Sequence, residues 1–185
     1  MEQEVFEDLL DSISTNIQLM FNAETSPVPE SHVSQRPDFE NDFICMISLA
    51  NQSFQGQLVI GFNEKTVNTI LAEVMTLVST EEEKFELLRA SLGELLNTIG
   101  GDFAQKESAR KAYEWLDLST PSVWEKNCAP FFCKSEGLSG KLMFGDDDIN
   151  TYLTVSPYKI LTNSDDGIDI SDFLDDDLDD LLSGL

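Results

Sequence analysis

The apolar residues of the stretch 79–106 recur at steps of three and four, which is the spacing of an amphipathic helix. At about 100° per residue they fall into one stripe that we expect to face a hydrophobic core: Phe85, Leu88, Leu92, Leu95, Ile99 and Phe103. Thr80 is a favourable N-cap residue, and Glu83 three positions later completes a capping box. The pattern therefore predicts one long helix from Thr80 to Lys106.

Elsewhere the pattern predicts an amphipathic helix that packs on the domain, a proline-containing linker, one further helix and several short strands. In chain order these segments are a helix over 2–23, the linker 24–41, strands at 43–49 and 55–62 with a turn at 51–53, a helix over 64–78 capped by Asn63, and strands at 122–124, 129–134, 141–144 and 151–155, with a hairpin turn at 135–140 and an acidic turn at 146–148. We therefore expect an α/β (α+β) domain over 42–160, with an antiparallel-rich sheet of about five to six strands and long helices packed on it.

Residues 161–185 form an acidic segment that we expect to be flexible. Nine of the 35 acidic residues and none of the 11 basic ones follow Ser164, and such a density of like charge favours disorder. Apolar residues still keep a helical period there: Ile170, Phe173, Leu174, Leu178, Leu181, Leu182 and Leu185. A tail that docks on a partner and a plain solvated terminus both remain open.

A net charge of −24 over 185 residues disfavours binding to nucleic acid or to anionic membranes. An acidic nucleic-acid mimic would need that charge on one rigid surface, whereas much of it lies in the tail.

The three cysteines lack metal-ligand spacing, so we expect free thiols in a reducing cytoplasm. The N-terminus does not have the pattern of a signal peptide, and no apolar run is long enough for membrane insertion. His32, the single histidine, lies in the linker, which argues against histidine-dependent catalysis.

The side of the long helix opposite its apolar stripe carries an unusual set of residues. Ala90, Glu94, Asn97, Gly101 and Ala104 share this face, where an ordinary solvated helix would carry long charged side chains. Glycines such as Gly100 and Gly101 each cost about 1 kcal/mol relative to alanine inside a helix, which suggests either a helix that ends there or close approach of another body. We expect a partner to dock here on a carboxylate and an amide, although a plain solvated pair is the alternative.

Several enzyme classes lack their residues in this chain. No second carboxylate accompanies Glu94, as a glycosidase would need. No cysteine or histidine is spaced for zinc, so we expect no metal site, and no glycine-rich phosphate-binding loop follows a strand. The pair Glu94 and Asn97 makes chemical sense if the partner supplies most of the reactive groups.

The sequence Glu94-Leu-Leu-Asn97-Thr-Ile-Gly-Gly101 resembles the E-x-x-N-x-x-x-G motif of the CheC/CheX/FliY family of response-regulator phosphatases. Thr120 and Pro121 match the proline that follows the motif in that family. The resemblance is to CheX-like members and covers 43–152, but some relatives carry Asp or Ser where this chain has Ala90.

The resemblance implies a CheX-like fold and hydrolysis of the aspartyl phosphate of a CheY-like response regulator. By this resemblance Asn97 orients the attacking water and Glu94 pairs with a lysine of the regulator. The chain would need no cofactor of its own, because the regulator supplies Mg²⁺, and it would form a homodimer. The alternative is a non-catalytic adaptor of the same fold in chemotaxis or two-component signalling, with the acidic tail recruiting a partner.

Overall fold

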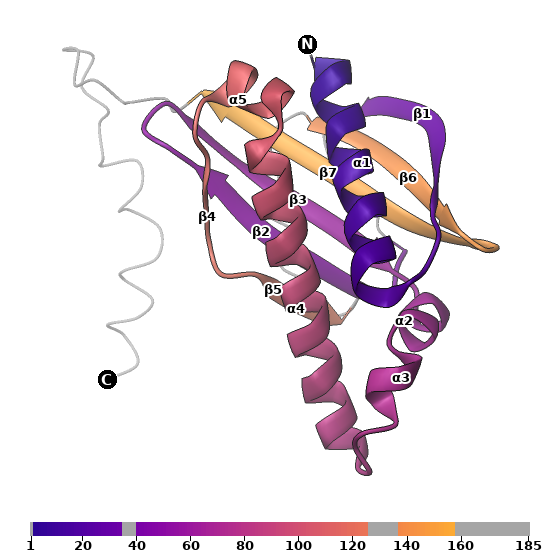
Figure 1. Ribbon diagram of the computed structural model, residues 1–185. Coiled ribbons are helices and arrows are strands. Elements are labelled where there is room, and N and C mark those ends of the chain that lie inside the picture. The colour runs from indigo at the N-terminus through magenta and orange to yellow at the C-terminus, as the bar shows by residue number, and fades with distance from the viewer. Residues whose placement is uncertain (1, 35–39, 126–136, 158–185) are drawn as a thin grey trace, which may run out of the picture.

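The computed structural model describes residues 2–34, 40–125 and 137–157, and these residues form five helices and seven strands (Figure 1). In chain order the elements are α1 (Glu2–Phe21), β1 (Ser26–Ser34), β2 (Phe43–Ala50), β3 (Phe54–Phe62), α2 (Glu64–Ile70), α3 (Ala72–Met75), α4 (Glu81–Gln105), α5 (Glu107–Tyr113), β4 (Asp117–Leu118), β5 (Ser122–Glu125), β6 (Gly137–Phe144) and β7 (Asp147–Pro157).

The strands form one sheet in the order β1-β6-β7-β3-β2-β4, and β5 also pairs with β2. β4 pairs with Leu49 and Ala50 at one end of β2, while β5 pairs with residues 43–46 at the other end. These two short strands therefore share one position at the sheet edge. Every pairing is antiparallel, so the expected fold class, an antiparallel-rich sheet with long helices packed on it, is confirmed.

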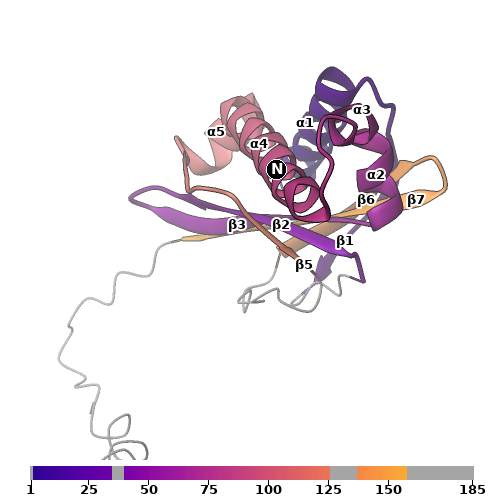
Figure 2. The same cartoon turned by 90° about the horizontal axis from the view of Figure 1, so that it is seen from below.

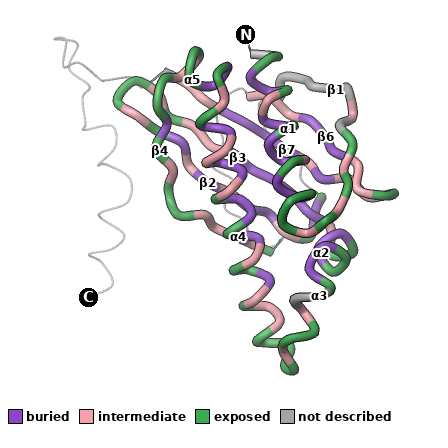
Figure 3. The backbone as a smooth tube through the Cα atoms, viewed as in Figure 1, coloured by how far each residue is buried: buried purple, intermediate pink, exposed green. Residues whose placement is uncertain are grey.

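The helices lie on one face of the sheet (Figure 2). Because side chains alternate across a strand, Cys45, Ile47 and Leu49 of β2 enter the main core under the helices. Ile44, by contrast, belongs to a small second cluster together with Val59 of β3. Burial is concentrated along the central strands and the inner sides of the helices (Figure 3), so the main core lies between the two layers.

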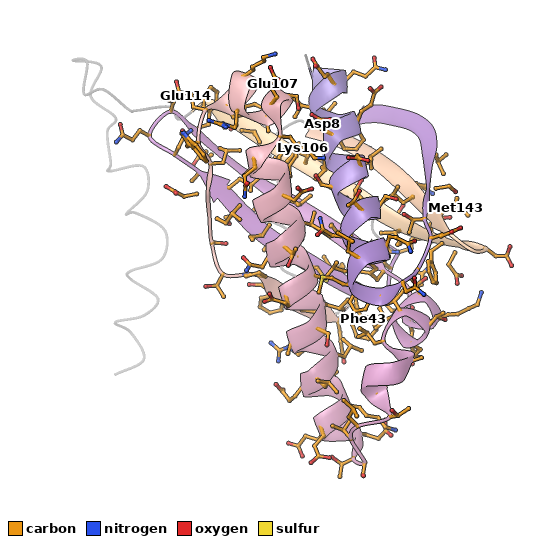
Figure 4. All side chains as sticks on the ribbon, in the orientation of Figure 1. Asp8, Phe43, Lys106, Glu107, Glu114 and Met143 are labelled. Carbon is orange, nitrogen blue, oxygen red and sulfur yellow. The ribbon has the colours of Figure 1, made fainter. Side chains whose placement is uncertain are left out.

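The N-terminal amphipathic pattern is confirmed as α1, which packs against α4. Its apolar side is fully or almost fully buried at Val5, Phe6, Leu9, Ile13 and Ile17. Charged contacts add to this packing: Asp11 accepts a hydrogen bond from Lys106 Nζ at 2.9 Å, and Asp8 accepts one from the Ser108 hydroxyl. Figure 4 shows Asp8 and Lys106 facing one another across the gap between the two helices. The first helix is thus an integral part of the core.

The expected linker 24–41 contains strand β1, which the proline pattern did not predict. β1 lies at the sheet edge and pairs with β6 alone, with a register irregularity between Val28 and His32. An edge strand tolerates prolines such as Pro27 and Pro29, because its outer N–H groups have no ladder partner to lose.

The helix expected over 64–78 is interrupted, since α2 ends at Ile70 and α3 begins at Ala72. The start of α2 also differs from the prediction in detail. Asn63 occupies the N-cap position without a capping bond, and its side-chain oxygen accepts a hydrogen bond from Asn41 at 3.1 Å. Asp42 accepts from the backbone N–H of Glu64 at 2.8 Å instead, so a residue from before β2 caps this helix.

The hairpin turn expected at 135–140 is wrong where the structure describes it, because Gly137–Gly140 are part of β6. The chain reverses later, at Gly145, whose φ of 60° is typical of glycine. Two residues of the expected acidic turn begin β7, and each pairs with a lysine: Asp147 with Lys65 and Asp148 with Lys141, both at 2.9 Å. The expected strand 129–134 and the acidic tail 161–185 lie outside the described residues.

Candidate functional site

α4 begins at the predicted capping box. The Thr80 hydroxyl accepts a hydrogen bond from the backbone N–H of Glu83, and the Glu83 carboxylate accepts one from the backbone N–H of Thr80, both at 3.2 Å. The contacts with Thr80, together with one from Ser79, hold the pKa of the Glu83 carboxyl below its ordinary value. The helix then runs without interruption to Gln105, so the motif residues occupy a regular helical frame.

The inward side of α4 fixes how the helix is rotated about its axis. The predicted stripe is buried from the second turn onward, at Leu88, Leu92, Leu95, Ile99 and Phe103. At the C-terminal end the Lys106 ammonium is bound to Asp11 of α1, and this hydrogen bond raises the pKa of Lys106 despite partial burial. Because the apolar stripe faces the core, the side of the helix that carries Glu94 and Asn97 faces outward.

Glu94 and Asn97 are both exposed on that outward face, as the sequence predicts. They stand one turn apart, so their side chains leave the same side of the helix. The Thr98 hydroxyl donates to the backbone carbonyl of Glu94 at 2.9 Å. Within the described residues neither the Glu94 carboxylate nor the Asn97 amide has a hydrogen bond or an ion pair. Both groups are therefore available to another molecule.

The small residues around this pair differ in what surrounds them. A Cβ added at Gly101 or Gly93 would meet nothing within 4 Å, so the space outside both glycines is open. Gly100 faces inward, where its added Cβ would lie 3.4 Å from a Leu118 methyl group. Ala90 is exposed, but Ala104 is only 7% exposed and belongs to the core. The expectation that Ala104 faces a partner is wrong in this structure, because its methyl group is packed in the main core.

An open depression of about 350 Å³ adjoins the motif on the side of strand β5. Ala90 and Gly93 of α4 form one wall, and Pro121 and Trp124 belong to the other. Arg89 also lines it, with its guanidinium 3.8 Å from the Glu86 carboxylate. Sequence reasoning missed Arg89 and Trp124, because the pairing of β5 with β2, which brings them together, leaves no local signal.

The Thr120-Pro121 segment joins β4 to β5 and is held against β2. The backbone N–H of Ser48 donates to the Ser119 hydroxyl, and the backbone N–H of Ser119 donates to the Ser48 carbonyl, both at 3.0 Å. Thr120 is exposed and Pro121 is half-buried in the wall of the depression. The segment thus reaches the neighbourhood of the motif helix.

Other candidate chemistry receives no support from the described part of the chain. No group of three or more His, Cys, Asp or Glu residues there is arranged to hold a metal ion. Cys45 is fully buried, and burial raises its thiol pKa far above the ordinary value, whereas Cys128 and Cys133 lie outside the described residues. None of the described helices combines the length and apolar character needed to cross a membrane.

The family model described as "Chemotaxis phosphatase CheX" matches residues 43–132. This stretch begins with β2 and contains Glu94, Asn97 and the Thr120-Pro121 segment. A comparison with curated protein sequences finds no match.

Several solved structures share the fold. A putative chemotaxis protein from Desulfovibrio vulgaris Hildenborough has a TM-score of 0.70 at 14% identity, over 83% of this chain and 97% of that chain. The chemotaxis protein CheX from Vibrio vulnificus has a TM-score of 0.65 at 16% identity, over 83% and 99%. A chain of the CheX–CheY–BeF3–Mg²⁺ complex from Borrelia burgdorferi has a TM-score of 0.59 at 19% identity, over 83% and 97%. The matching family model, the shared fold and the motif on the central helix together make this chain similar to CheX-like proteins.

Proposed function

We propose that this chain hydrolyses the aspartyl phosphate of a CheY-type response regulator. The observation that carries the proposal is the exposed pair Glu94 and Asn97, free of partners among the described residues and flanked by the open glycines Gly93 and Gly101. The family model and the Borrelia burgdorferi complex of CheX with CheY support this choice of partner.

In the proposed reaction a water oxygen attacks the phosphorus atom in line with the aspartyl oxygen. The new phosphorus–oxygen bond forms as the bond to the aspartyl carboxylate breaks, so the carboxylate is restored and inorganic phosphate leaves with the oxygen and protons of the water. The Asn97 amide can accept and donate hydrogen bonds at once, which allows it to hold the water without removing a proton. Its contribution is therefore orientation, which lowers the entropic part of the barrier.

Glu94 has a different role in the proposal. Its carboxylate forms a charge-assisted hydrogen bond with the lysine of the regulator's phosphorylation site, which positions the two proteins on one another. The Mg²⁺ that neutralises phosphoryl charge belongs to the regulator. The low surface at Gly93 and Gly101 lets α4 approach close enough for Asn97 to reach the phosphoryl group.

The test follows the loss of phosphate from phosphorylated CheY-type regulators with and without this protein. Asn97→Ala should remove most of the acceleration, about 100-fold, while binding to the regulator in Mg²⁺ and beryllofluoride is kept. Glu94→Ala should weaken both binding and hydrolysis. Asn68→Ala, an exposed amide on α2, is the matched control and should behave like the unchanged protein.

If phosphate is lost equally fast with Asn97→Ala and with the unchanged protein, the water-orienting role is wrong. Binding that depends on phosphorylation but never accelerates hydrolysis would instead support the adaptor function.

A further inference from the structure

Trp115 presents a large aromatic side chain to solvent. It is 63% exposed, and among the described residues it is the one aromatic side chain in the group of exposed large hydrophobics, the others being Leu19, Met20 and Leu77. Exposed tryptophan side chains are uncommon on surfaces without a partner and are enriched where binding energy concentrates. The packing of the described residues leaves most of the Trp115 ring in solvent, and a binding partner would account for that exposure.

The indole is held in place. The Arg110 guanidinium of α5 lies 4.3 Å from the centre of the Trp115 ring, which is a close cation–π contact. The contact fixes the ring and places a positive charge beside it. A side chain ordered before binding loses less entropy when it is buried by a partner.

The backbone on both sides of Trp115 is equally constrained. The Asn51 amide donates to the carbonyls of Tyr113 and Trp115 at 2.7 and 2.9 Å. The Tyr113 ring packs edge-on against Phe54, with ring centres 5.6 Å apart. The β2–β3 turn thus clamps the segment that follows α5.

Between these clamped residues, Glu114 has φ 63° and ψ −141°. Residues with a Cβ rarely adopt this region, and such strain persists where the surroundings impose it, often at functional sites. Figure 4 shows Glu114 at the corner where α5 turns towards β4. The strained corner turns the chain so that Trp115 points outward while the next residue, Leu116, is buried.

This corner lies on the same side of the sheet as the motif, because the ring packs on α5 and α5 follows α4 in the helix layer (Figures 1 and 2). Leu118 of β4 touches the Gly100 position of α4. Trp115 is three residues from Leu118, which is roughly 10 Å of extended chain. Asn97 is three residues from Gly100, which is roughly 5 Å along the helix. With the Gly100–Leu118 contact between them, these two steps bound the separation of Asn97 and Trp115 at roughly 20 Å. A standard interface covers about 800 Å² per partner, a disc roughly 32 Å across, so one interface can cover both residues.

We propose that Trp115 is a docking anchor for the response regulator that α4 engages, a role that rests on the proposed function. The indole packs on an apolar patch of the regulator beside its phosphorylation site, and Arg110 meets an acidic group at the rim of that patch. Trp115 does not touch the reacting atoms, so it sets affinity and the choice of regulator but not the rate of hydrolysis in the complex.

The test compares Trp115→Ala, Trp115→Phe and the control Leu77→Ala, whose leucine is 78% exposed. Binding to the regulator is measured in Mg²⁺ and beryllofluoride, and hydrolysis is measured at increasing regulator concentration. Trp115→Ala should weaken binding about 30-fold and raise the half-saturating concentration equally, with the rate at saturation unchanged. Trp115→Phe should restore part of the affinity, and Leu77→Ala should match the unchanged protein.

A spectroscopic readout reports on the residue itself. The chain has two tryptophans, so 5-fluorotryptophan gives two ¹⁹F resonances, and Trp115→Phe identifies that of Trp115. Adding the regulator should shift this resonance and reduce its sensitivity to solvent.

The outcomes separate the two proposals. Unchanged affinity of Trp115→Ala for a regulator whose dephosphorylation depends on Asn97 would overturn the anchor and leave the proposed function standing. If Trp115→Ala changed only the self-association of this chain, the proposed role as an anchor for the regulator would be overturned in favour of a contact between copies of the chain. If the unchanged protein neither binds nor dephosphorylates any CheY-type regulator, both proposals fail.

Discussion

Replacing Gly101 by alanine should stabilise the protein, because this glycine has no structural role inside the molecule. The added Cβ would meet nothing within 4 Å, so no clash offsets the gain. Alanine is about 1 kcal/mol more favourable than glycine in a helix interior, and we expect a gain of roughly 0.5–1 kcal/mol. Urea unfolding measures it: with a slope of about 2 kcal/mol per molar urea, the midpoint should rise by roughly 0.3–0.5 M.

Gly140→Ala is the matched control, since its Cβ would lie 2.6 Å from the buried Phe6 ring. Such overpacking typically costs about 1–3 kcal/mol, so the two glycine variants should move the midpoint in opposite directions. A lower midpoint for Gly101→Ala would refute the reasoning, because it would mean that another part of the chain covers this face.

A larger side chain at the same position separates stability from docking. Gly101→Leu should fold, because the space outside the helix is open, but its side chain would stand between α4 and a partner. We expect at least about a tenfold loss of regulator binding, a size typical of an obstructed interface position. Normal binding by Gly101→Leu would show that the partner does not approach this turn of the helix.

Three further predictions concern stability. Glu83→Gln should lower stability near neutral pH, because contacts with Thr80 lower the carboxyl pKa in the folded state. The difference should fade as the pH falls from the ordinary glutamate pKa through the lowered folded-state pKa, below which the carboxyl group is protonated in both states, and urea unfolding at several pH values measures it. Phe6→Ala should cost about 3–5 kcal/mol, since Phe6 is 1% exposed in the main core, and thermal unfolding would show a large fall in Tm. Glu114→Gly should raise stability by about 1 kcal/mol by relieving a positive φ, and an unchanged or lower urea midpoint would contradict the strain argument.

Local patterns predicted the central helix well. The capping box at Thr80 and the apolar stripe from Leu88 to Phe103 are set by residues three and four positions apart, and the structure has both. Glu94 and Asn97 emerge on the exposed side for the same reason. The relation between two neighbouring turns of one helix is fixed by geometry, so distant parts of the chain need not be known.

Features that depend on strand neighbours were not predicted. The prolines of β1 predicted a linker, because sequence alone does not distinguish an edge strand from an extended connection. Periodicity placed Ala104 on the exposed stripe, yet it is packed in the main core, and the helical period alone does not show which turns of a helix are covered. The depression beside Arg89 and the clamp that Asn51 places on Trp115 join segments that are dozens of residues apart, and no spacing rule links them.

The stretch that the family model matches is shorter than the part of the chain that folds together. The family match opens at residue 43, whereas α1 and β1 precede it and complete the helix layer and one sheet edge. A fragment trimmed to the matched stretch would lack α1, which packs on α4, and would also lack β7, the neighbour of β3 in the sheet. Such a fragment would expose surface that is buried in the full chain, so inactivity measured on it would say nothing about the roles proposed for Glu94 and Asn97.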